Sequence, residues 1–171
     1  MISTNNVVSQ SIYTQKPLEP YYILQLEDVG TYLFSFSIEY GNNGLSGIML
    51  AKFDGNKIMA SIVNEFGIKI IDFSVSDGNV EINYAADKLN NRFVKKIIES
   101  DLGFLFSKFP PNTNNKYNYE LQFNPNGSYK ISKLLKHKTV QCFECNKDRN
   151  YTVINLRNNI SYKLTFLQFD E

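Results

Sequence analysis

The sequence has no tryptophan, one histidine and two cysteines among its 171 residues. The side chains that most often carry catalysis or bind metals are therefore scarce. No stretch approaches the roughly 18–20 consecutive apolar residues of a membrane-spanning helix, and residues 1–16 lack the charged start and apolar core of a secretory signal. Lysine and arginine are scattered, with no basic run longer than Lys95-Lys96, so we expect no nucleic-acid partner.

The composition is that of a folded domain. Apolar residues make up 43% of the chain and charged residues 20%, with a formal net charge of +1. This balance excludes a wholly disordered chain, and the length suits one domain with a real core. Phenylalanine and tyrosine together reach 14%, and their broad side chains suit β-strands that fill a curved interior.

Apolar runs of strand length, separated by turn residues, dominate the chain. Tyr32–Tyr40 alternates strictly, and Asp54-Gly55 marks a tight hairpin turn. The other expected strands are Ser46–Phe53, Lys57–Asn64, Ile68–Val75, Val80–Tyr84, Tyr117–Phe123, Ser128–Leu135, His137–Cys145, Tyr151–Arg157 and Ser161–Phe169. This pattern predicts a strongly curved antiparallel sheet, an incomplete or half barrel.

Between the two groups of strands, the apolar spacing changes to steps of three and four residues. This change predicts one long helix at about residues 87–107. Asp87 suits its N-cap, and Pro110-Pro111 forces it to end before them. We therefore expect an α+β fold with the helix packed on the concave side of the sheet.

The polar N-terminus differs from the rest of the chain. Residues 1–25 are expected to form a tail or arm, with a short helix or strand at Tyr21–Leu26. Residues 26–171 are expected to form a single domain.

Cys142 and Cys145 form the only pattern that resembles a metal or redox motif. Residues three apart on a regular strand point to opposite faces, so two inert free thiols are one interpretation. If Cys145 begins the following turn, a local disulfide in an oxidising compartment is a second, and half of a metal site is a third. Because there is no second cysteine pair, we expect no metal. His137 lies between two lysines without a nucleophile motif, and we expect it at the surface end of a strand.

Two carboxylates lie within apolar patterns, Asp72 in an expected strand and Asp101 on the apolar edge of the helix. Either is a candidate for a buried functional carboxylate. The alternative is that each pairs with a nearby cation, Asp72 with Lys69 or Arg92 for example. No phosphate-binding glycine loop and no nucleophile–base pair are visible, so we expect neither a cofactor nor enzymatic activity.

Aromatic residues of the expected inner face are the remaining candidates for a binding site. A cavity lined by them would accept an acyl chain or another apolar ligand. The alternative is that they pack against the helix and fill the core. The candidates are Phe34, Phe36, Tyr84, Phe93, Phe106, Tyr119, Phe123, Tyr129 and Phe166.

The segment at about residues 31–106 resembles a group of small, uncharacterised bacterial proteins, typically lipoproteins of Bacteroidetes-type bacteria. The similarity is carried by LSGIMLAKFDGNKIMASIVNEFGIKIIDFSV, VEINYAADKLN and the helix ending ESDLGFLF. The turn Asn64-Glu65-Phe66-Gly67 is its most distinctive part, and Gly67 is expected to take a backbone conformation closed to other residues. In its order of strands and helix, the group is similar to the LolA/LolB-like periplasmic carrier and outer-membrane receptor of the Lol (lipoprotein localisation) system. Residues 117–169 agree only in their succession of strands.

This resemblance implies a non-enzymatic half-barrel domain whose apolar cavity binds acyl chains of a lipid or a lipoprotein. It also implies attachment at the periplasmic face of the outer membrane through a lipidated N-terminal cysteine. The sequence has no cysteine near residue 1, so under this interpretation the anchor is missing from the chain, and a cytoplasmic location is the alternative. The alternative function is a structural or interaction module of the outer membrane with a packed core and no ligand.

Overall fold

The computed structural model describes residues 21–109 and 116–170, which contain one large antiparallel sheet and one α-helix. The helical elements are a 3₁₀ turn, η1 (Asp87–Leu89), and α1 (Arg92–Leu105). The strands are β1 (Tyr21–Tyr22), β2 (Gly30–Tyr40), β3 (Asn43–Phe53), β4 (Lys57–Val63), β5 (Lys69–Ser76), β6 (Asn79–Ala85), β7 (Lys108–Phe109), β8 (Asn118–Phe123), β9 (Tyr129–Leu135), β10 (Lys138–Cys145), β11 (Asn150–Asn155) and β12 (Ile160–Asp170).

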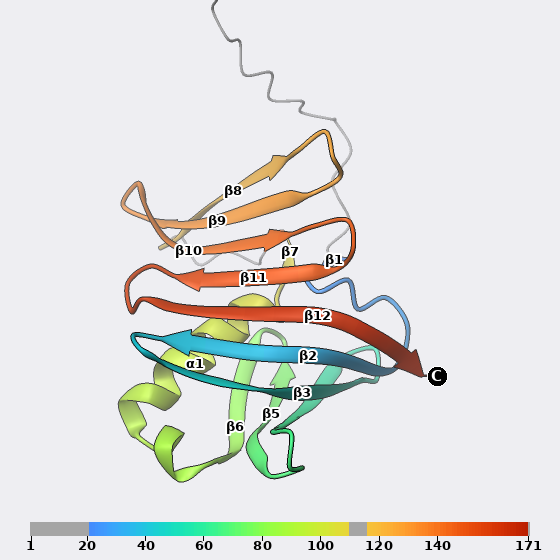
Figure 1. The fold of residues 1–171 in the computed structure, drawn as a ribbon. Coiled ribbons are helices and arrows are strands. Elements are labelled where there is room, and N and C mark those ends of the chain that lie inside the picture. The colour runs from blue at the N-terminus through green and yellow to red at the C-terminus, as the bar shows by residue number, and fades with distance from the viewer. Residues whose placement is uncertain (1–20, 110–115, 171) are drawn as a thin grey trace, which may run out of the picture.

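Ten strands form one sheet in the order β6-β5-β4-β3-β2-β12-β11-β10-β9-β8, and β1 pairs with β7 separately. Neighbours in the sheet are neighbours in the sequence at every step except one. The last strand, β12, lies between β2 and β11 (Figure 1). It therefore joins the group of strands that precedes the helix to the group that follows it.

The sheet bends around the helix. α1 contacts β6 at one end of the sheet and β11 in the other half, and Figure 1 shows β6 running at a steep angle to β11 and β12. Where β3 meets the end of β4, a Cβ on Gly47 would overlap the carbonyl oxygen of Val63 and lie 2.8 Å from its carbonyl carbon. Glycine alone lets the end of β4 approach β3 so closely. The predicted curved antiparallel sheet with a helix on its concave side is confirmed.

The core lies between the inner face of the sheet and the helix. Along β2, buried residues alternate with half-buried ones, so that Phe34, Phe36 and Ile38 all point inward. The helix presents a buried stripe that includes Ile98 and Leu102 to the same interior. Each such side chain contributes about 1.5–3 kcal/mol when it is fully buried, so this shared interior is the main source of stability.

The helix begins later than the sequence pattern predicts. Asp87 belongs to η1, and the prediction that it caps the helix was wrong. The N-cap is Asn91, whose backbone is extended and whose side chain accepts hydrogen bonds from the N–H groups of Phe93 (2.8 Å) and Val94 (3.4 Å). An asparagine there satisfies two backbone donors that the helix itself leaves free.

Of the short helix or strand expected at Tyr21–Leu26, the structure has the two-residue strand β1. Its partner β7 was missed, because two residues carry no periodicity. The β4–β5 turn has Gly67 at φ +75°, as predicted. Residues 1–20 of the expected arm and the Pro110-Pro111 pair lie outside the described residues, and the division into arm and domain stays a prediction.

Candidate functional site

The nine predicted site residues fall into three groups in the structure. Phe34, Phe36, Phe106 and Tyr129 are buried in the core, and Tyr119 and Phe166 are half-buried against it. The other three, Tyr84 (45% exposed), Phe93 (69%) and Phe123 (67%), are open to solvent.

The three exposed aromatic residues lie in different parts of the molecule. Tyr84 stands opposite Asp72 across the β5–β6 pair, and the Lys69 ammonium lies 5.9 Å from the centroid of its ring. Phe93 is in the first turn of α1. Phe123 ends β8 opposite Tyr129, which points into the core. Of the three, Phe123 is therefore the one that continues the inner face.

A row of aromatic rings crosses the inner face from this exposed end to the buried interior. Ring centroids are 6.0 Å apart for Phe123–Tyr129, 5.8 Å for Tyr129–Phe143 and 5.9 Å for Phe143–Tyr151. Tyr151 then meets Phe34 at 6.3 Å. Centroids at these separations give favourable tilted and edge contacts beyond simple burial.

Phe143 and Tyr151 were missed as members of this row. The available signal was the parity of their strands, because Phe143 shares its face with Cys145, and Tyr151 shares its face with Val153. Both residues are fully buried. They connect the exposed end of the row to the centre of the core.

Residues 23–26 cover the middle of the inner face. Ile23, Leu24 and Leu26 are buried in the core cluster. The Tyr129 hydroxyl donates to the carbonyl oxygen of Ile23 (2.9 Å). The Tyr151 hydroxyl shares its one proton between the carbonyl oxygen of Leu24 (3.2 Å) and the side-chain oxygen of Gln25 (3.1 Å). Burial raises the pKa of Tyr151 to about 12, which keeps this hydroxyl a donor. The middle of the face is thus closed by backbone and side chains.

Beyond this cover, the face stays open at the β8 edge. We call the inner-facing side chains Tyr119, Leu121 and Phe123 the β8 strip. Tyr119 and Leu121 are half-buried and Phe123 is exposed. They stand opposite Lys133, Ile131 and Tyr129 of β9. The strip is therefore a partly uncovered apolar surface continuous with the core.

Asp101 connects the helix to three strands. It is 1% exposed, and it accepts hydrogen bonds from the side chains of Gln141 (2.5 Å), Asn155 (2.7 Å) and Tyr162 (2.8 Å). Burial raises the pKa of Asp101, and the three hydrogen bonds oppose that rise. The prediction of a buried carboxylate is confirmed, but its hydrogen-bond partners are neutral groups and not a lysine or arginine. Its role is to fix the helix to the sheet.

This raised pKa gives Asp101 a characteristic effect on stability. The pKa of Asp101 is higher in the folded chain than in the unfolded chain, where it is near 3.8. The contribution of Asp101 protonation to the free energy of unfolding is therefore fully present below about pH 3.8. It decreases as the pH rises through the folded pKa. We expect the stability advantage of the natural protein over Asp101→Asn, which cannot titrate, to shrink as the pH rises from 3.5. Urea unfolding of both proteins at several pH values measures this difference. A difference in the free energy of unfolding that stays the same at every pH would contradict the prediction.

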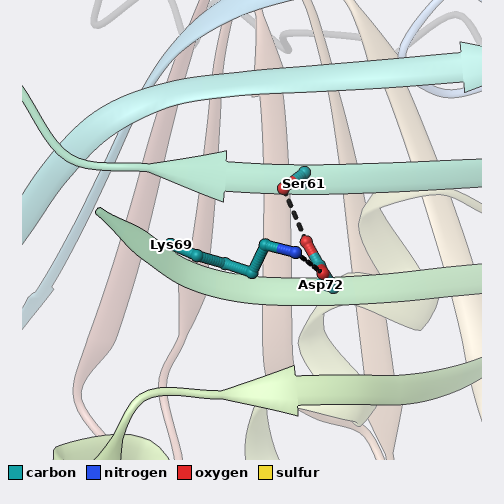
Figure 2. Close-up of polar contacts among 3 residues, drawn as sticks. All are labelled: Ser61, Lys69 and Asp72. Carbon is teal, nitrogen blue, oxygen red and sulfur yellow. Dashed lines mark hydrogen bonds and ion pairs between the residues drawn. The ribbon is translucent and has the colours of Figure 1, made fainter. Parts of the chain in front are cut away.

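Asp72 lies on the outer face and forms the expected pair with Lys69. The Lys69 ammonium is 2.5 Å from one carboxylate oxygen, and the Ser61 hydroxyl donates to the other at 2.5 Å (Figure 2). Lys69 is about half exposed, and exposed ion pairs contribute little, typically about 0.2–1 kcal/mol. This cluster is a polar link between β4 and β5.

Cys142 and Cys145 are both buried and free. Cys145 belongs to the core cluster, whereas Cys142 lies outside it, with its sulfur 4.0 Å from the Ser132 hydroxyl oxygen. The interpretation as two free thiols on opposite faces is confirmed. Burial raises the pKa of the Cys145 thiol, which lowers its reactivity. His137 is exposed, as predicted, but it lies in the turn between β9 and β10 and not in the strand His137–Cys145 that was expected, because β10 begins at Lys138.

Two shallow hollows lie away from the β8 strip. One, of about 350 Å³, is lined mainly by residues of β2, β3 and β12, with hydroxyl groups such as those of Ser35 and Thr165 beside charged Lys163. The other, of about 330 Å³, lies between Gln25, Tyr32 and Arg149. Across the described ranges, no three histidine, cysteine or acidic side chains are grouped to hold a metal ion. Within the same ranges, no helix has the length and apolar character needed to cross a bilayer.

Comparison with known proteins gives distant structural similarity. No protein-family model and no curated protein sequence matches the chain. Among solved structures, it is similar to MucB, with 11% identity and a TM-score of 0.44 over 82% of this chain and 53% of MucB. It is also similar to an outer-membrane lipoprotein-sorting protein domain from Vibrio parahaemolyticus, with 8% identity and a TM-score of 0.31 over 84% of this chain and 86% of that domain. This chain spans about half the length of the MucB chain, and at these TM-scores neither similarity carries an argument about function.

Proposed function

We propose that this chain is a non-enzymatic protein that binds an acyl chain of a lipid or a lipoprotein on the β8 strip. The observation that carries the proposal is the exposure of Phe123 on the same face as the core. A ligand chain lying against Tyr119, Leu121 and Phe123 would extend the apolar interior over the uncovered edge. Each buried methylene contributes about 0.8 kcal/mol, so such a site needs no catalytic group.

The proposal places the ligand at one end of the inner face and not beneath the helix. Phe34, Phe36 and Phe106 are at most 4% exposed, and Phe106 packs against Phe73 at a centroid distance of 5.4 Å. Of the nine predicted residues, Tyr119 and Phe123 are therefore the proposed contacts, and the buried Tyr129 packs against Phe123 from the core. The sequence resemblance adds a location to the proposal, the periplasmic face of the outer membrane.

Substitution of Phe123 tests the site. Phe123→Ala should weaken binding of a fluorescent fatty acid by about 5- to 30-fold, which corresponds to about 1–2 kcal/mol for the exposed part of a phenylalanine side chain. The fluorescence titration is repeated with Phe93→Ala, a matched control because Phe93 is equally exposed but lies on α1. Equal affinities of the two variants would argue against the β8 strip as the site.

A second candidate function is an interaction module without a ligand. It is favoured by the dense packing of Phe34, Phe36 and Phe106 under the helix. Native mass spectrometry of the natural protein after mild extraction separates the candidates. A bound lipid supports the binding protein, whereas ligand-free spectra together with no response to the fluorescent fatty acid support the module.

A further inference from the structure

We infer that the ligand of the β8 strip is a single-chain amphiphile with an anionic headgroup, and that Lys133 holds this headgroup. The inference rests on the proposed function and names its ligand class. It is based on the position of one ammonium group at the end of the strip.

Lys133 is an inner-facing residue of β9. It stands opposite Tyr119 on one side and Gln141 on the other. Its ammonium lies 4.4 Å from the centroid of the Tyr117 ring and 5.6 Å from that of the Phe104 ring. Two aromatic faces thus hold the charged end of this half-buried side chain in place.

This ammonium has no ion-pair partner in the part of the chain that the structure describes. The ion pairs there are Lys69–Asp72, Lys130–Glu144 and Lys163–Glu39. Asp101 is the acidic group that acts on Lys133, but both of its oxygens already accept hydrogen bonds from neutral side chains, and Lys116 adds a like charge. Burial lowers the pKa of Lys133. A bound anion would stabilise the charged form of this half-buried ammonium by supplying the ion-pair partner that the described residues do not.

The apolar strip leads directly away from Lys133. Opposite pairs follow in the order Lys133–Tyr119, Ile131–Leu121 and Tyr129–Phe123. With a rise of about 3.4 Å per residue, these four steps along the strand give a length of about 14 Å. One end of this path carries a cation and the rest is apolar, which is the complement of an anionic headgroup with one alkyl chain. A neutral ligand would leave the ammonium unpaired.

The test compares three probes of the same chain length, each displacing a fluorescent fatty acid from the natural protein at pH 8. We expect dodecanoate to bind about tenfold more tightly than dodecanol, since a charge-assisted hydrogen bond is available to the carboxylate alone. Dodecyltrimethylammonium should bind more weakly than dodecanol. These ratios need no mutant and therefore do not depend on whether a variant folds.

The Lys133→Met variant then assigns the effect to this side chain. It should lose about tenfold in affinity for dodecanoate while its affinity for dodecanol stays the same. Lys130→Met is the matched control, because Lys130 lies on the same strand, points outward and pairs with Glu144. Lys133→Gln serves if the methionine variant does not fold, as judged by its urea unfolding.

The possible results separate this inference from the proposed function. If no probe displaces the fluorescent fatty acid and none binds by itself, the proposed function fails. If dodecanol binds as tightly as dodecanoate, or if Lys133→Met leaves their ratio unchanged, the β8 strip remains an acyl site and the role of Lys133 is overturned.

Discussion

Replacing Asp101 by alanine should destabilise the protein by about 3–5 kcal/mol. The change removes the acceptor shared by Gln141, Asn155 and Tyr162 and leaves three buried donors without partners. Each unsatisfied buried donor costs about 1–3 kcal/mol, and water entering the vacated space recovers part of this cost. Since small domains are stable by about 5–15 kcal/mol in total, the loss should appear as a large shift of the urea unfolding midpoint.

The matched control is Glu99→Ala, which removes a carboxylate two residues earlier in the same helix. Glu99 forms none of the ion pairs among the described residues and is half-buried, not buried. We expect its effect to stay within about 0.5 kcal/mol, as for most surface positions. If both variants unfold at the same denaturant concentration, Asp101 does not fix the helix to the sheet.

Replacing Gly47 by alanine should cost about 3 kcal/mol, although it adds a single methyl group. The new Cβ would overlap the carbonyl oxygen of Val63 and stand 3.2 Å from the Cα of Asn64. These are backbone atoms of the neighbouring strand, which cannot move aside as a flexible side chain would. Overpacking of this kind costs about 1–3 kcal/mol, and a clash with backbone places it at the upper end.

Gly44→Ala provides the comparison on the same strand. A Cβ there would meet the carbonyl oxygen of Ile38 at 3.5 Å, which is ordinary contact distance. It should leave the unfolding midpoint almost unchanged. Thermal and urea unfolding of both alanine variants measure the difference, and equal midpoints would mean that the close approach of β4 to β3 does not depend on a glycine at position 47.

Local periodicity accounts for the part of the fold that was predictable. Strands such as Gly30–Tyr40 bury alternate residues, and a period of two residues is visible in any window of that length. The helix is visible for the same reason, since its buried positions recur at three and four residues. Its start was misplaced because Asp87 and Asn91 are both good N-cap residues, and tertiary packing selects between them.

Long-range pairing accounts for what the sequence did not reveal. Nothing local to Ile160–Asp170 indicates that it pairs with β2, which lies more than a hundred residues earlier. The partners of Asp101 come from β10, β11 and β12, so their convergence depends on the completed sheet. Interpretation of Asp101 as a buried carboxylate was therefore possible, but its neutral partners were not predictable.

For the candidate site, the face that each side chain occupies was predictable from the sequence, but its exposure to solvent was not. Strand parity correctly placed Phe34 and Phe123 on the inner face, because parity alone decides which face a side chain occupies. It carries no information on how far residues 23–26 and α1 extend over that face. The difference between the fully buried Phe34 and the exposed Phe123 is thus a property of the assembled fold.

The central place of β12 has a consequence for biosynthesis. Chains emerge from the ribosome N-terminus first, so β2 and β11 are both made before the eleven-residue strand that separates them. Until residue 170 is available, each half of the nascent chain presents an unsatisfied strand edge that other chains can pair with. Translation errors or proteolysis that remove Ile160–Asp170 would therefore leave the edges of β2 and β11 unpaired and yield aggregation-prone fragments.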